Sequence, residues 1–104
     1  MNKVYIAGPI TNCEDYYENF TQREKELVYM GYKVVNPAER GEVLKKQLGR
    51  EPSHKEYMNY LLPMLLNCDH ISLLPGWEKS KGAKIEYDVA LATGKTIIDV
   101  KVIS

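Results

Sequence analysis

The chain has 104 residues, of which 44% are apolar, so it is long enough for one compact core and too short for two ordinary domains. We expect a single domain over residues 1–104. Its 14 Lys and Arg balance its 14 Asp and Glu, so net charge offers no electrostatic case for broad binding to nucleic acid or to a membrane surface. No apolar run approaches the roughly 20 residues that cross a bilayer. Partners are therefore expected to be small molecules or other protein chains.

Cysteine and histidine usage argues against a metal site. Cys13 and Cys68 have no metal-like spacing with each other or with His54 and His70. The N-terminus does not resemble a signal peptide. We therefore expect reduced thiols in a cytoplasmic protein.

Short β-type apolar runs alternate with helix-length segments along the chain. In chain order, the predicted elements are a strand at 3–7, a helix at 14–30, a strand at 32–35, a short helix at 43–48, a helix at 54–67, a strand at 70–74, a helix at 82–93 and a strand at 96–100. Gly31 and Gly94 end the helices that precede them. Ser53 and Glu56 form a capping box, and Pro63 is expected to kink or divide the helix that follows.

This alternation predicts an α/β fold in which right-handed crossovers build a parallel sheet with helices on both faces. The expected architecture is a three-layer α/β/α, flavodoxin- or Rossmann-like domain with four or five strands in the order 2-1-3-4. In such sheets, ligands bind at the carboxyl ends of the strands where the order reverses. Two loops meet there, Gly8–Asn12 and Pro75–Ala83.

The second loop leads into a helix whose start is suited to binding an anion. Free backbone N–H groups and the positive end of the helix dipole favour an anion there, and Ser80 is the natural contact. Lys79, Lys81 and Lys84 would add positive potential, although loop lysines are more often only solvated charges. The G-x-G-x-x-G and P-loop fingerprints are both absent.

Four further side chains are candidates, and three of them have a plain structural alternative. The helix dipole favours the ionised form of Glu86, which suits a nucleophilic carboxylate, but acidic residues also simply stabilise first helical turns. Asp69 has an alternative as a turn residue or cap. Trp77 would stack on a flat ring or cover the domain. The hydroxyl of Tyr5, within a central strand, needs a partner that the cleft supplies.

Three segments together resemble the nucleoside 2-deoxyribosyltransferase superfamily. They are VYIAGPIT near the N-terminus, VVNPAE after the second strand, and CDHISLLPGWEKSKGAKIEYDVALATGK. The likeness spans nearly the whole chain, is closest to small phage and prophage members, and is most specific in the order D…S-x-G-x-x-x-E-x-x-x-A-x-x-x-G-K. The superfamily includes transferases that move 2-deoxyribose between bases and hydrolases that cleave 2′-deoxynucleoside 5′-monophosphates.

The resemblance implies roles for individual residues. Glu86 falls on the nucleophile that attacks C1′ of the deoxysugar and forms a covalent ester, which water or a second base resolves. Asp69 falls on an aspartate that orients the sugar or assists base protonation, and Tyr5 on a tyrosine near the nucleophile. The implied substrate-binding residues are Gly8, Pro9, Ile10, Thr11, Asn12, Gly76, Trp77, Ser80 and Gly82. The chemistry requires no cofactor, and relatives assemble as dimers or larger homo-oligomers.

Position 80 distinguishes the branches of the superfamily. Nucleoside-using transferases have an aspartate there, whereas the monophosphate hydrolases have a serine that contacts phosphate, as Ser80 would. The hydrolases follow their glycine with Ser-Ile-Arg, and this chain lacks that arginine, so Thr11 and Asn12 are the remaining donors. Two alternatives stay open: a nucleotide-binding or sensing domain without turnover, and a glycohydrolase of another N-glycoside such as NAD.

Overall fold

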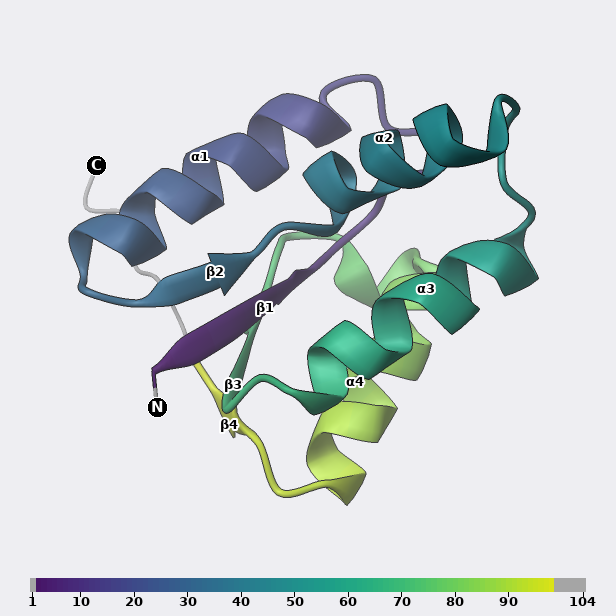
Figure 1. Cartoon of the computed structure of the whole chain (residues 1–104). Coiled ribbons are helices and arrows are strands. Elements are labelled where there is room, and N and C mark those ends of the chain that lie inside the picture. The colour runs from purple at the N-terminus through teal and green to yellow at the C-terminus, as the bar shows by residue number, and fades with distance from the viewer. Residues whose placement is uncertain (1, 99–104) are drawn as a thin grey trace.

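A computed structural model describes residues 2–98 and shows a four-stranded, all-parallel sheet in the order β2-β1-β3-β4 (Figure 1). The elements are β1 (Lys3–Ala7), α1 (Tyr16–Tyr29), β2 (Lys33–Val35), α2 (Pro37–Leu48), α3 (His54–Leu66), β3 (His70–Leu73), the short 3-10 helix η1 (Trp77–Lys79), α4 (Lys81–Ala92) and β4 (Thr96–Ile97). The predicted Rossmann-like α/β fold and strand order are confirmed. The last two residues of the predicted fourth strand, 99 and 100, lie outside the described residues.

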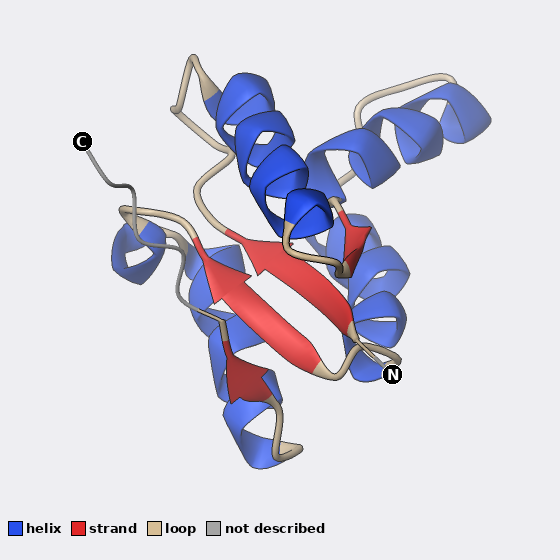
Figure 2. Ribbon diagram, turned by 90° about the vertical axis from the view of Figure 1, so that its left-hand side faces the viewer, coloured by secondary structure: helices blue, strands red, loops and turns tan. Residues whose placement is uncertain are grey.

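Strand β1 separates two hydrophobic clusters because its side chains alternate between the faces of the sheet. Tyr5 and Ala7 pack with residues of α3 and α4 on one face. Val4 and Ile6 pack with residues of α1 on the other. Figure 2 shows helices on both sides of the central strands. The sheet is therefore covered on both faces, as its continuous apolar strands require.

Helix α2 begins earlier than predicted. The side chain of Asn36 caps it, accepting hydrogen bonds from the backbone N–H groups of Ala38 at 3.0 Å and Glu39 at 3.4 Å, and Pro37 occupies the first turn. Proline is favoured there because its missing N–H has no helical partner to lose. Asn36 and Pro37, which indicate the end of a strand in the sequence, thus also begin a helix. The prediction of a short helix at 43–48 was wrong.

Helix α3 starts at the predicted capping box. The Ser53 hydroxyl accepts from the Glu56 N–H at 3.1 Å, and the Glu56 carboxylate accepts from the Ser53 N–H at 2.9 Å. The helix continues through Pro63, so the predicted alternative of a divided helix is wrong. The turn joining α2 and α3 lies beyond the carboxyl end of β1 (Figure 1). None of the described helices has both the length and the apolar character needed to cross a bilayer.

Candidate active site

A cleft of about 1000 Å³ lies at the carboxyl ends of β1 and β3. This volume is at the upper end of the range for small-molecule sites. Residues from both predicted loops line it, together with residues of α1, α2, α3 and α4. The predicted site residues on its surface are Gly8, Pro9, Ile10, Thr11, Asn12, Gly76, Ser80, Gly82 and Glu86. The crossover between β1 and β3 therefore brings together segments that are more than 60 residues apart in sequence.

Glu86 joins the floor of the cleft to the sheet. It lies in the second turn of α4 and is only 5% exposed. Its Oε2 accepts a hydrogen bond from the hydroxyl of Tyr5, a fully buried residue of β1. Its Oε1 accepts no hydrogen bond from the described residues, yet it is not among the fully buried polar atoms, so it retains access to the cleft. The carboxylate is thus held at one oxygen and open at the other.

Burial raises the pKa of Glu86 to about 7, and the hydrogen bond from Tyr5 opposes that rise. The helix dipole favours an ionised carboxylate, but removal from water dominates here. The pKa of Tyr5 lies well above its ordinary value, because of burial first and the neighbouring Glu86 second. Tyr5 therefore remains a protonated donor, while Glu86 changes charge near neutral pH.

Close backbone packing brings the two loops together. A Cβ added to Gly8 would lie 2.7 Å from the Cβ of Leu74, so only glycine fits between the end of β1 and the second loop. Gly76 has φ of 85°, a left-handed conformation that glycine adopts without strain. A Cβ at Gly76 would meet Pro9 at 3.3 Å. Gly8 and Gly76, both predicted to bind substrate, therefore shape the cleft by letting its loops approach.

Ser80 is the N-cap of α4. Its Oγ accepts from the backbone N–H of Ala83 at 3.3 Å. The N–H groups of Lys81 and Gly82 have no hydrogen-bond partner among the described residues, as is usual for the first turn of a helix. Lys79 and Lys81 also line the cleft and form no ion pair within the described part of the chain. This rim is therefore electropositive and rich in donors.

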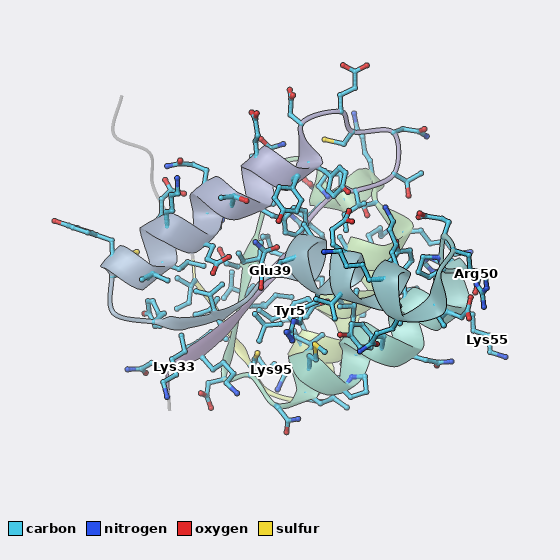
Figure 3. All side chains as sticks on the ribbon, turned by 45° about the horizontal axis from the view of Figure 1, so that its top comes forward. Tyr5, Lys33, Glu39, Arg50, Lys55 and Lys95 are labelled. Atoms are coloured by element: carbon cyan, nitrogen blue, oxygen red, sulfur yellow. The ribbon has the colours of Figure 1, made fainter. Side chains whose placement is uncertain are left out.

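Asp69 lies at the opposite end of the sheet. It directly precedes β3, its carboxylate accepts from the backbone N–H of Lys3 at 3.2 Å, and that hydrogen bond lowers its pKa. Because β1 and β3 are parallel, Asp69 and Lys3 mark their amino ends, whereas the cleft lies at the carboxyl ends. Figure 3 shows Lys33, the first residue of β2, on the side of the molecule opposite to Arg50 and Lys55. The structure therefore places Asp69 away from the cleft, where its carboxylate links the amino ends of β1 and β3.

Trp77 packs beside the cleft and does not line it. Its ring lies 4.4 Å from that of Tyr87, centroid to centroid, and contacts the cluster beneath α3 and α4. Of its two predicted roles, covering the domain fits this position, and stacking on a ligand would require the side chain to move.

A group of five polar residues on the α1–α2–α3 side of the cleft was not predicted. We call it the tyrosine–carboxylate wall, and its members are Tyr16, Glu42, Lys45, Glu51 and Tyr57. They come from three helices and one loop, and no short motif links them in sequence. The predicted helix began only at residue 43, so it did not include Glu42. In the full α2 helix, Glu42 and Lys45 are three residues apart and lie on one face.

The described residues contain no group of three or more His, Cys, Asp or Glu side chains that would hold a metal ion. The fold and the cleft define a Rossmann-like α/β protein with a buried carboxylate at the floor of a ligand-sized cleft. The chain belongs to the family described as "Domain of unknown function (DUF4406)", which matches residues 2–99. A comparison with curated proteins found no match, and a comparison with solved structures found none either.

Proposed function

We propose that this protein cleaves or transfers the N-glycosidic bond of 2′-deoxynucleosides or their 5′-monophosphates through a covalent deoxyribosyl ester of Glu86. The observation that carries the proposal is the state of this carboxylate. It is buried, fixed at Oε2 by Tyr5, and accessible at Oε1 from a cleft large enough for a nucleotide. A fixed, partly dehydrated carboxylate beside a sugar is the arrangement that retaining glycosidases use.

In the first step, Oε1 of Glu86 attacks C1′ as the C1′–N bond breaks, and the bonding electron pair leaves with the base. The base takes up a proton from solvent. In the second step, the oxygen of water or a nitrogen of a second base attacks C1′, the ester C1′–O bond breaks, and the carboxylate is restored. The proton lost by the water or by the base nitrogen passes to solvent. Both transition states have oxocarbenium character. The hydrogen bond from Tyr5 positions the carboxylate and favours its ionised, nucleophilic form.

The α4 rim supports a 5′-phosphate on the substrate. The free N–H groups of Lys81 and Gly82, with the positive end of the helix dipole, match the chemistry of phosphate binding. Lys79 and Lys81 add two cations. The exposed Thr11 and Asn12 line the facing loop and offer donors where the monophosphate hydrolases that the sequence resembles have an arginine. We therefore favour the monophosphate over the free nucleoside.

A glycohydrolase of a larger N-glycoside such as NAD is a second candidate. The size of the cleft favours it, because about 1000 Å³ leaves room beyond a single nucleotide. A requirement for a 2′-deoxy sugar separates the two candidates.

The test is release of free base from a panel of 2′-deoxynucleosides, their 5′-monophosphates and NAD, with and without a second base. Wild type is compared with Glu86→Ala and with Glu78→Ala, which changes an exposed glutamate outside the cleft. We expect release that Glu86→Ala abolishes and Glu78→Ala preserves. No release from any panel member by folded wild-type protein would overturn the proposal.

Substitution of Ser80 tests the phosphate preference. Aspartate caps a helix about as well as serine, so Ser80→Asp preserves the start of α4 while placing a negative charge beside the proposed phosphate. We expect turnover of the monophosphate to fall at least tenfold relative to the free nucleoside. An unchanged ratio would place the phosphate elsewhere.

A further inference from the structure

The cleft has unlike charges at its two sides. On the α4 side are Lys79, Lys81 and the free N–H groups at the start of the helix. On the other side, the tyrosine–carboxylate wall contains the two carboxylates Glu42 and Glu51 and the single ammonium group of Lys45. The two ends of a nucleoside monophosphate match these two sides. Its phosphate is an anion, which suits the α4 side, and many bases carry N–H donors, which suit the carboxylates.

Within the wall, both tyrosine hydroxyls and two of the three N–H groups of Lys45 are already committed to carboxylates. Lys45 Nζ lies 3.5 Å from the Glu42 carboxylate and 3.2 Å from that of Glu51. The Tyr16 hydroxyl donates to Glu42 at 3.4 Å, and the Tyr57 hydroxyl donates to Glu51 at 3.1 Å. Burial, followed by the bond to Glu51, raises the pKa of Tyr57 to about 12, so this hydroxyl keeps its proton.

The remaining capacity of the wall is therefore mainly to accept hydrogen bonds, since the third N–H of Lys45 is its one uncommitted side-chain donor among the described residues. All the contacts of Glu42 involve its Oε1, so its Oε2 has no partner in the part of the chain that the structure describes. Carboxylate oxygens accept several hydrogen bonds each, whereas an ionised carboxylate has nothing to donate. A ligand group with N–H donors gains charge-assisted hydrogen bonds here, and a carbonyl oxygen is repelled.

The separation between the tyrosine–carboxylate wall and Glu86 suits a ligand that contacts both. Leu61 packs in one cluster with Tyr5, the partner of Glu86, and it lines the cleft. Tyr57 precedes Leu61 by one turn of α3, a rise of roughly 6 Å. The flat rings of Tyr16 and Tyr57 add apolar surface suited to a planar heterocycle.

We infer that the tyrosine–carboxylate wall is the subsite for the leaving base, and that it selects bases with an exocyclic amino group over their oxo or unsubstituted counterparts. This inference rests on the proposed function for its substrate class. The phosphate then lies at the start of α4, the base lies against α2 and α3, and C1′ lies between them over Oε1 of Glu86. Glu42 and Glu51 are specificity residues in this arrangement.

The experiment measures binding, so that it does not depend on turnover. Dissociation constants are determined by calorimetry for Glu86→Gln, with two matched pairs of ligands. Deoxycytidine and deoxyuridine monophosphates differ by amino against oxo, and deoxyguanosine and deoxyinosine monophosphates differ by amino against hydrogen. The same constants are then measured for two variants of the Glu86→Gln protein. One also carries both Glu42→Gln and Glu51→Gln. The control carries Glu39→Gln instead, since Glu39 is an exposed glutamate of α2 outside the cleft. Thermal unfolding confirms that each variant is folded.

We expect the amino member of each pair to bind about tenfold more tightly or better, since one charge-assisted hydrogen bond distinguishes the members. The Glu42→Gln and Glu51→Gln changes should remove or reverse the preference, because a glutamine amide also donates to an oxo group, and Glu39→Gln should leave it unchanged. Equal binding within the pairs, no binding by folded protein, or a preference that survives both glutamine changes would overturn the inference. Selective binding without base release by wild type would refute the proposed function alone, and base release without amino preference would refute the subsite alone.

Discussion

Replacement of Glu86 by glutamine should make the protein more stable at neutral pH and not at acidic pH. Burial raises the pKa of this carboxyl from 4.5 to about 7. Between these values the folded state binds more protons than the unfolded state, so the carboxyl's contribution to the free energy of unfolding is greatest at low pH. It declines as the pH rises and levels off above about 7. Glutamine has nearly the same size, accepts the Tyr5 hydrogen bond and never ionises.

The magnitude follows from the pKa change. A rise from 4.5 to about 7 corresponds to about 3 kcal/mol in the free energy of unfolding, at 1.36 kcal/mol for each tenfold change in proton affinity. The free energy of unfolding of Glu86→Gln minus that of wild type should therefore be larger near pH 8 than near pH 4, by up to about 3 kcal/mol. A gain in stability from changing a residue of the candidate active site would be an instance of the trade-off between stability and function.

The assay is equilibrium urea unfolding of wild type and Glu86→Gln between about pH 4 and pH 8. The difference between the two proteins removes the contribution of all other titrating groups. Glu78→Gln is the matched control, because Glu78 is exposed and forms no ion pair among the described residues. A difference between wild type and Glu86→Gln that does not change with pH would refute the reasoning about burial.

Four further predictions concern the same site. Base release by wild type should rise with pH through about 7 as Glu86 ionises and then level off, and a pH–rate profile would show this. Tyr5→Phe removes the bond that opposes the rise in the Glu86 pKa, so the midpoint of that profile should move upward, by roughly 1–2 on the pH scale; an unchanged midpoint would contradict the coupling. Gly8→Ala should lower the free energy of unfolding by roughly 1–3 kcal/mol because its Cβ would lie 2.7 Å from Leu74. Gly82→Ala, whose Cβ meets only ordinary contacts at 3.7 Å, should raise it by up to about 1 kcal/mol, as urea unfolding would measure.

The strand order was predictable because each central strand is a short apolar run with clear boundaries. Most of Lys3–Ala7 and the two central residues of His70–Leu73 are buried, and both segments are followed by glycine and proline turns. In a parallel sheet this arrangement also places the two following loops side by side. The position of Glu86 on the cleft follows from the same geometry, although its function stays a proposal.

Other features depend on tertiary contacts that have no local pattern. Asp69 is an exception, because it directly precedes the strand predicted at 70–74 and its place at the amino end of β3 therefore follows from the sequence. The contact between Trp77 and Tyr87 depends on how η1 folds back on α4. The tyrosine–carboxylate wall requires α2 and α3 to pack as a pair. The expected homodimer or larger oligomer stays a prediction.

The most direct test of the account is to trap the covalent intermediate. Wild type is mixed with the deoxynucleoside monophosphate that it turns over best, quenched in acid within the first turnover, digested and examined by mass spectrometry. The account predicts a deoxyribosyl phosphate ester on the peptide that contains Glu86, and no such adduct in Glu86→Gln. Base release that continues at the wild-type rate in Glu86→Gln, or an adduct on another residue, would contradict it.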